Sequence, residues 1–282
     1  MAEEAVQVRK GGVSPGGNQP DREAIVQVRD VTVRFGTSTV LETLSLDVYR
    51  GEIMGFVGAS GAGKSVLLRA ILGLVPKSGG VIRMFGQDLA KLNDAERMQI
   101  DMRQGVLFQQ GALFSALTVL ENIQVPMREY LDLPRALMNE LALLKVELVG
   151  LPRDAANKYP AELSGGMIKR AALARALALD PDIVFLDEPT SGLDPISAAE
   201  FDELVVNMRD TMGLTVYMVT HDLDSLLTVC DRIAVLGKKR VLVEGTIDDM
   251  MHSEEPWVKS YFRGKRARRV VSGEERTEKT KS

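Results

Sequence analysis

Eight residues in the first quarter of the chain have the composition of a phosphate-binding loop. Gly58–Ser65 has the pattern G-x-x-x-x-G-K-S and follows the apolar run Ile53–Val57. Glycines allow consecutive backbone N–H groups to face phosphate oxygens, and the helix expected next adds the positive end of its dipole. We expect Lys64 to reach the β- and γ-phosphates and Ser65 to ligate Mg²⁺. The predicted nucleoside triphosphate contacts are Gly58, Ala59, Ser60, Gly61, Ala62, Gly63, Lys64, Ser65 and Val66.

Two carboxylates follow a second apolar segment. Ile183–Leu186 precedes Asp187 and Glu188, and a buried parallel strand delivers its C-terminal residues to the ligand-binding edge of a sheet. Asp187 is expected to hold Mg²⁺, directly or through water, and Glu188 to polarise a water for attack on the γ-phosphate. A solvated acidic turn is the alternative, but the phosphate loop in the same chain favours catalysis.

A histidine follows the strand expected at Leu214–Val219. His221 comes after Thr220 and therefore projects at the same sheet edge. An imidazole there can contact the γ-phosphate and orient the attacking water. A lone histidine is more often structural, but the position after a strand favours a functional histidine.

The segment Leu163–Met167, L-S-G-G-M, precedes another expected helix. A serine hydroxyl and glycine amides at a helix N-terminus form a second phosphate-type cap, although an ordinary serine N-cap is the alternative. One chain has no need for two γ-phosphate caps. We therefore expect Ser164, Gly165 and Gly166 to face the nucleotide of another subunit.

Apolar periodicity places these motifs in an α/β domain. Alternation predicts strands within 26–35 and 44–48, and a further strand pair at 81–85 and 105–108. From about residue 118 to 161 the spacing becomes helical, which predicts a helical insertion; strand and helix patterns then alternate to residue 243. The insertion has Leu137, Leu141, Leu144 and Leu148 on one side.

The predicted domain organisation has three parts. Residues 1–23 are rich in Gly, Pro and charge without periodicity and are expected to be disordered. The main domain spans 24–250 with its insertion at about 116–162, and 251–282 form a C-terminal helix and a basic tail. The helix at Pro256–Phe262 is expected to dock on its own domain or on a sister protomer. The basic run 263–269 could contact anionic lipid, but a solvated tail is favoured.

Composition excludes several classes of protein. The net charge of −4 over 282 residues gives no nucleic-acid signature. The single cysteine excludes an intramolecular disulfide framework, and Cys230 is expected to be a packed thiol. No apolar run approaches the ~18 residues that span a bilayer, and no signal-peptide core is visible. We therefore expect a soluble, cytoplasmic protein whose membrane contact is made mainly through a partner.

Taken in order, the motifs resemble those of the ATP-binding cassette (ABC) ATPases over roughly residues 25–250. Gly58–Ser65 is similar to the Walker A loop, Leu163–Met167 to the signature, and Asp187 with Glu188 to the end of Walker B. Ser191–Asp194 resembles the D-loop, and His221 the switch histidine.

Two further positions are assigned from the resemblance. Phe35 resembles the aromatic that stacks on adenine, with a core aromatic as the alternative. Gln109 resembles the Q-loop glutamine that senses Mg²⁺ and the attacking water, although Gln110 beside it leaves the register slightly open. The resemblance thus implies catalytic residues Glu188, His221, Gln109 and Lys64, and metal ligands Ser65, Gln109 and Asp187.

The resemblance also implies an architecture and a reaction. The fold expected is a P-loop ABC core with an antiparallel β subdomain and an inserted helical subdomain. Two copies are expected to dimerise head-to-tail around two ATP molecules with Mg²⁺, each Walker A loop facing the other copy's signature. Hydrolysis would then reopen the dimer.

A departure in the signature narrows the family. Met167 stands where glutamine is usual; together with 108–114 (FQQGALF) and 125–129 (VPMRE) it resembles the Mla/Mce-type bacterial lipid-transport ATPases. That resemblance implies a peripheral subunit on the cytoplasmic side of the inner membrane, bound to permease subunits and working with a periplasmic Mce-type lipid-binding protein. The alternative is an importer of small polar solutes. Leu113, Phe114 and Leu117 are candidates for a permease groove or for the core of the insertion.

Overall fold

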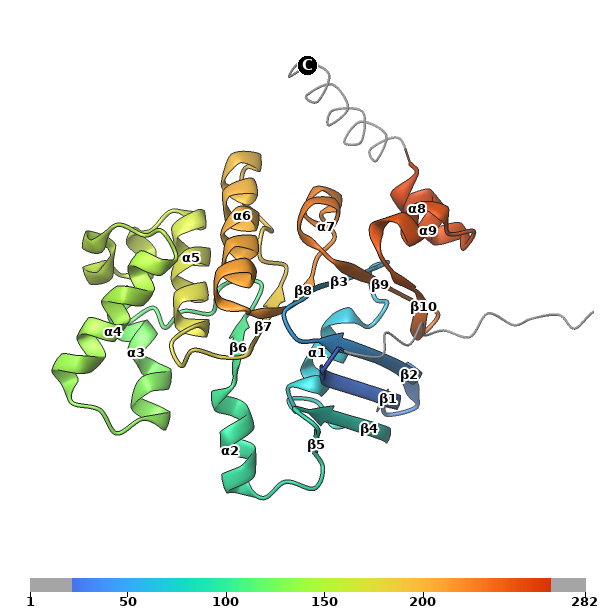
Figure 1. Cartoon of the computed structure of the whole chain (residues 1–282), viewed down its shortest axis with the longest axis horizontal. Coiled ribbons are helices and arrows are strands. Elements are labelled where there is room, and N and C mark those ends of the chain that lie inside the picture. The colour runs from blue at the N-terminus through green and yellow to red at the C-terminus, as the bar shows by residue number, and fades with distance from the viewer. Residues whose placement is uncertain (1–21, 265–282) are drawn as a thin grey trace, which may run out of the picture.

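The computed structural model describes residues 22–264, which form two sheets and flanking helices (Figure 1). The expected disordered segment 1–23 lies almost entirely outside the described residues, as does the basic run beyond Gly264. The larger sheet has the strand order β10-β9-β3-β8-β7-β6. Its strands are β3 (Ile53–Gly58), β6 (Gln104–Leu107), β7 (Ile183–Asp187), β8 (Thr215–Val219), β9 (Arg232–Gly237) and β10 (Arg240–Gly245).

Five of these strands run parallel, and only β10 is antiparallel to its neighbour β9. The three central strands, β3, β7 and β8, are buried along their whole length, because helices pack on one face of the sheet and the helix at 64–71 packs on the other together with strands of the smaller sheet. Asp187 pairs with Val219, and Phe56 of β3 pairs with that same Val219. The residues that follow β3, β7 and β8 are therefore delivered to one edge.

The smaller sheet is antiparallel, with the order β2-β1-β4-β5. The alternation expected within 26–35 forms a single strand, in which a bulge with Asp30 at φ 50° shifts the pattern between Val28 and Val31. The expected pairing of 81–85 with 105–108 is wrong: β4 belongs to this sheet and β6 to the parallel one. The strands are β1 (Ala24–Phe35), β2 (Ser38–Tyr49), β4 (Gly79–Met84) and β5 (Gln87–Asp88).

Helices fill the range expected for the insertion: α3 (Val119–Tyr130), α4 (Arg135–Leu148) and two short 3₁₀ turns, η1 (Arg153–Asn157) and η2 (Pro160–Glu162). They lie to one side of the sheets, next to α5 (Figure 1). The leucine stripe of α4 does not form its buried face: Leu137, Leu144 and Leu148 are exposed, at 41%, 56% and 37%. Ala142, Val146 and Val149 are buried instead.

The remaining helices connect the strands or close the chain. The C-terminal helix α9 packs on its own chain, since Val258 and Phe262 are fully buried in the core shared with the parallel sheet. Cys230, just after α7, is buried as expected. Among residues 22–264 no helix is both long and apolar enough to span a membrane. The helices are α1 (Lys64–Ile71), α2 (Asp94–Met102), α5 (Gly165–Ala176), α6 (Pro195–Met212), α7 (Leu223–Val229), α8 (Ile247–His252) and α9 (Pro256–Phe262).

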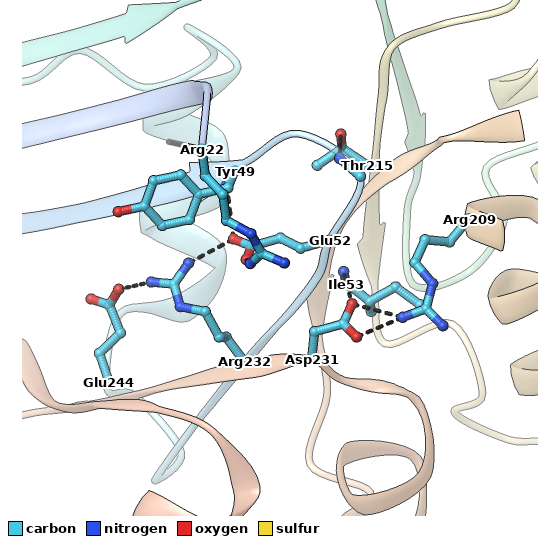
Figure 2. Close-up of polar contacts among 10 residues, drawn as sticks. Arg22, Tyr49, Glu52, Ile53, Arg209, Thr215, Asp231, Arg232 and Glu244 are labelled. Atoms are coloured by element: carbon cyan, nitrogen blue, oxygen red, sulfur yellow. Dashed lines mark hydrogen bonds and ion pairs between the residues drawn. The ribbon is translucent and has the colours of Figure 1, made fainter. Parts of the chain in front are cut away.

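Ion pairs hold together the end of the parallel sheet at which its strands begin, which we call the starting edge (Figure 2). Glu52, 1% exposed, accepts a hydrogen bond from Arg232 at 2.7 Å, and Arg232 also pairs with Glu244. Asp231 accepts from the Ile53 amide at 2.8 Å and pairs with Arg209. These contacts join β3, β9 and β10 at the edge opposite to the predicted site.

Candidate nucleotide site

The phosphate loop connects the end of β3 to the start of α1. Gly63 has φ 97°, and a Cβ there would lie 2.6 Å from Leu41 Cδ2. A Cβ on Gly58 would lie 2.3 Å from the Leu236 carbonyl oxygen. Both positions therefore require glycine. The loop turns back on itself, and Lys64 Nζ donates to the Gly58 carbonyl at 2.8 Å.

The two carboxylates of the β7 end lie near this lysine. Burial, and then the neighbouring Glu188 carboxylate, raise the pKa of Asp187, whereas Arg69, Lys169 and Lys64 oppose that rise. Burial lowers the pKa of Lys64, and the two carboxylates oppose that change. The sheet edge thus brings Lys64, Asp187 and Glu188 into one electrostatic environment.

His221 and Glu188 are in direct contact. The Nδ1 atom of His221 lies 2.6 Å from Oε2 of Glu188, the histidine being 68% and the glutamate 14% exposed. An exposed imidazole fixed on a largely buried carboxylate can present its other nitrogen to a ligand.

Sequence reasoning missed Tyr261 of α9, whose hydroxyl donates to the His221 carbonyl at 2.8 Å. Trp257 stacks on the Tyr261 ring, and the two residues line a cleft together with Glu188 and His221. The aromatic pair at i and i+4 in 256–262 was visible in the sequence, but its target was not.

Phe35 and Gln109 both have exposed side chains at the ends of strands. Phe35 is 51% exposed at the end of β1, so the core alternative is wrong. Gln109 follows β6 in a turn that continues through Gly111 and Ala112, both with positive φ. Of the apolar residues after this turn, Phe114 is 53% exposed, whereas Leu113 packs partly on the core.

The signature segment lies on α5 and beside the start of α6. Ser164 is the N-cap of α5, its Oγ accepting from the Met167 amide at 3.3 Å. Gly165 and Gly166 adjoin Leu193 and Ser197, 3.8 Å from where a Cβ would stand. The serine oxygen accepts in this cap, which leaves its O–H to donate elsewhere.

A buried cation connects α5 to the turns after β6 and β7, and sequence reasoning did not single it out. Lys169 is 5% exposed, and its Nζ donates to the carbonyls of Gln109 and Glu188. It lies one turn before the buried Ala172 and two turns before Ala176. A lysine on an alanine face was the sequence signal, since a buried ammonium needs partners.

The donor set is consistent with a nucleotide-bound cation rather than a closed metal site. Within residues 22–264 no group of three or more His, Cys, Asp or Glu side chains could hold a metal ion. One buried carboxylate, Asp187, lies beside a second, Glu188. A divalent cation would offset the electrostatic cost of this pair, with further ligands from hydroxyl, amide and phosphate oxygens.

Comparison with known proteins places the chain in a family. A family model described as ABC transporter matches residues 41–191. The "Intermembrane phospholipid transport system ATP-binding protein MlaF" of Haemophilus influenzae is 38% identical over 85% of this chain and 90% of its own length. The "Probable ribonucleotide transport ATP-binding protein mkl" of Mycobacterium leprae is 37% identical over 90% of this chain and 73% of its own length.

Solved structures agree in fold. The dimeric ATP-binding cassette MJ0796 in a post-hydrolysis state with ADP and phosphate has a TM-score of 0.72 and 31% identity, covering 78% of this chain and 98% of its own. The protein cbiO1 of Clostridium perfringens, part of the ABC transporter complex cbiONQ, has a TM-score of 0.74 and 26% identity, covering 88% and 99%. The expected fold class is confirmed. The chain belongs to the ABC transporter family, and it is an ATP-binding, ATP-hydrolysing subunit of that family.

Proposed function

We propose that this chain dimerises on ATP and Mg²⁺ to drive a membrane permease that moves phospholipid or a related envelope lipid. The similarity to the Haemophilus influenzae relative, a phospholipid transport ATP-binding protein, supports the lipid as cargo. The main domain is assigned to 24–250, with the helical insertion at about 116–162 and the C-terminal segment at 251–282.

The phosphate loop would hold the triphosphate. Gly58–Ser65 supplies backbone amides and the start of α1, and Lys64 supplies charge. Mg²⁺ would be held by Ser65, Gln109 and Asp187 and would neutralise charge on the phosphates. Phe35, exposed at the end of β1, would stack on the adenine.

The contact between Glu188 and His221 is the observation that carries the catalytic assignment. Glu188 acts as the general base and accepts a proton from the attacking water. His221, held at 2.6 Å from that carboxylate, orients the water and contacts the γ-phosphate. An imidazole that is bonded on one side and exposed on the other suits this task.

The signature supports a head-to-tail dimer. Ser164 and Gly165 are exposed at the N-terminus of α5, where the helix dipole and amides favour an anion. We assign their ligand as the nucleotide bound by a second copy, so that each site is completed by two chains.

The helical insertion would face the permease. Phe114, just before the insertion, and Leu137, Leu144 and Leu148 of α4 are exposed apolar side chains, which a partner protein could cover. The subunit would then lie on the cytoplasmic side of the inner membrane, with a periplasmic Mce-type protein as a further partner of the permease.

Purification of the intact transporter from native membranes tests this proposal. We expect the chain to copurify with a permease and an Mce-type protein, and the complex in proteoliposomes to transfer fluorescent phospholipid when ATP is supplied. A complex containing Glu188→Gln should not transfer lipid. Capture of a solute-binding protein instead, with no lipid transfer, would contradict the proposal.

Ribonucleotide transport is the second candidate, supported by the similarity to the Mycobacterium leprae relative, a probable ribonucleotide transport ATP-binding protein. The same proteoliposomes distinguish the two. ATP-dependent uptake of a labelled ribonucleotide, without movement of phospholipid, would favour this candidate.

A further inference from the structure

Lys169 is a buried cation in α5 that the proposed chemistry does not use. The helix begins directly after Ser164, and Lys169 lies one turn further on with 5% of its surface exposed. Burial lowers the pKa of this amine, and the Glu188 and Asp187 carboxylates oppose that change. A buried ammonium is retained only where partners compensate its lost hydration.

Its partners are two backbone carbonyls from the proposed catalytic machinery. Nζ donates to the carbonyl of Gln109 and, at 3.0 Å, to that of Glu188. Both carbonyls belong to residues that lie just beyond the ends of β6 and β7. A single ammonium therefore bridges the turn after β6 and the turn after β7.

The Glu188 backbone has an unusual conformation. Its φ is 51°, a left-handed conformation that is unfavourable for a residue other than glycine. Such a conformation persists where surrounding contacts determine it. The Glu188 amide donates to the Val219 carbonyl at 2.8 Å, and its carbonyl accepts from Ser191 as well as from Lys169.

A second basic residue of α5 provides a comparison. Arg175 donates to the carbonyls of Gly111 and Ala112, at 2.9 and 2.7 Å, in the same turn as Gln109. Within the described part of the chain, Arg175 bonds only to the turn after β6, which contains Gln109. Lys169 bonds both to that turn and to Glu188. The two side chains separate an effect on the Q-loop from an effect on the base.

We propose that Lys169 is a positioning residue that fixes the backbone of Glu188 and Gln109 and couples both to the signature helix α5. The inference rests on the proposed function, because it takes Glu188 as the general base. In the proposed dimer, Ser164 at the head of α5 faces the nucleotide of the other copy. Lys169 then links the occupancy of one site to the base of the other.

The test replaces the ammonium in the full chain. Lys169→Met keeps length and apolar bulk but removes every donor, and we expect kcat for ATP hydrolysis to fall about 30- to 100-fold with KM within about threefold of wild type. Misplacement of a catalytic group by ~1 Å costs a factor of this size. Lys169→Arg, which retains charge and several donors, should restore kcat to within about fivefold of wild type.

Matched variants separate positioning from stability. Lys145→Met removes another buried lysine, 8% exposed and paired with Asp180 in the helical region, and should lower the melting temperature but leave kcat per folded molecule unchanged. Arg175→Met should reduce kcat less than Lys169→Met does. An equal loss in both would place the effect in the Q-loop and overturn the coupling to Glu188.

The opposite results are equally clear. A kcat within threefold of wild type for Lys169→Met, or a loss that Lys169→Arg does not rescue, would overturn the proposal. If Lys169→Met does not fold, Lys169→Leu, which also lacks a donor, decides on the same criterion, a fall in kcat at constant KM. Glu188→Gln, measured alongside, keeps the hypotheses apart: an active Glu188→Gln refutes the base assignment, whereas an inactive Glu188→Gln with an active Lys169→Met refutes this inference alone.

Discussion

The two ends of the parallel sheet both concentrate charge, and they treat it differently. At the starting edge, buried Glu52 lies between Arg232 and Arg22, and Asp231 pairs with Arg209 (Figure 2). At the finishing edge, where the parallel strands end, two consecutive carboxylates, Asp187 and Glu188, lie side by side. Charge is matched within the chain at one edge and left for a ligand at the other.

The residues that stabilise the sheet and the residues proposed to bind the ligand therefore lie at opposite ends of its strands. Paired buried charges hold β3, β9 and β10 together, and removing one partner leaves the other charge buried without compensation. Adjacent carboxylates and a left-handed Glu188 raise the free energy of the folded chain. A divalent cation bound together with the nucleotide would offset this cost, so we expect the nucleotide and the cation together to stabilise the protein by mass action.

The largest effect is expected at the starting edge. Arg232→Met leaves the buried Glu52 carboxylate with the Tyr49 amide at 2.8 Å and with Arg22, at 3.5 Å, as its remaining cationic partner. We expect the free energy of unfolding to fall by about 3 kcal/mol, with kcat per folded molecule within twofold of wild type. Urea denaturation and ATPase assays measure the two quantities, with Arg240→Met at an exposed position as the control. A large loss of kcat without loss of stability would erase the contrast between the edges.

A substitution at the finishing edge should change the affinity for ATP rather than the free energy of unfolding. Lys64→Ala removes a charge-assisted contact to phosphate and should raise the Kd for ATP about 10- to 100-fold, while unfolding changes little. Titration with a fluorescent ATP analogue measures the affinity, with Lys91→Ala, on the exposed lysine at 81%, as the control. Unchanged affinity would remove Lys64 from the phosphate site.

Asp202 is a buried carboxyl at neither edge, and it tests whether charge without a ligand costs stability. Burial raises its pKa to about 6 from 3.8, Ser225 opposes the rise, and Asp222 and Asp224 add to it. One Asp202 oxygen accepts from Ser225 at 2.6 Å, and the other has no partner within the described part of the chain.

The raised pKa of Asp202 determines how its contribution to stability changes with pH. The folded state binds the proton more tightly, so the favourable contribution is present below about pH 4 and is lost as pH rises to about 6. Asp202→Asn, neutral throughout, should be more stable than wild type by roughly 1–3 kcal/mol at pH 8, and the gain should shrink towards pH 4. Denaturation across pH checks this, with exposed Asp210→Asn as the control. A gain independent of pH would contradict the assignment.

Met167→Gln should have the smallest effect. The backbone amide of Met167 already donates to Ser164, and the substitution leaves the amides of Gly165 and Gly166 unchanged. We expect ATP hydrolysis within about threefold of wild type in a steady-state assay. An inactive variant would show that the methionine side chain has a specific function.

Local patterns predicted much of the fold, and they predicted the candidate site residues that the parallel sheet brings to one edge. The strand before Gly58–Ser65, the strand before Asp187 and the histidine after β8 all depend on short-range signals, and the parallel sheet brings them to one edge. The pairing of strands far apart in the sequence was harder to predict. The sequence of β4 and β6 contains nothing that assigns them to different sheets, because strand partners are fixed by tertiary packing.

The misses have physical causes. The α4 leucines were expected to lie on one side of the helix, but the buried positions of α4 are Ala142, Lys145 and Val146, and of the four leucines only Leu141 packs partly on the core. Lys169 and Tyr261 act on backbone carbonyls, which carry no sequence signature. Contacts of that kind emerge only when the chain is folded.

The clamping of ATP between two copies is tested most directly by the oligomeric state of Glu188→Gln. Size-exclusion chromatography with light scattering should show monomers without nucleotide and dimers with ATP and Mg²⁺. Adding Ser164→Glu, which opposes the phosphates with negative charge, should return the protein to monomers that still bind ATP. A Glu188→Gln protein that remains monomeric at saturating ATP and Mg²⁺ would contradict the account.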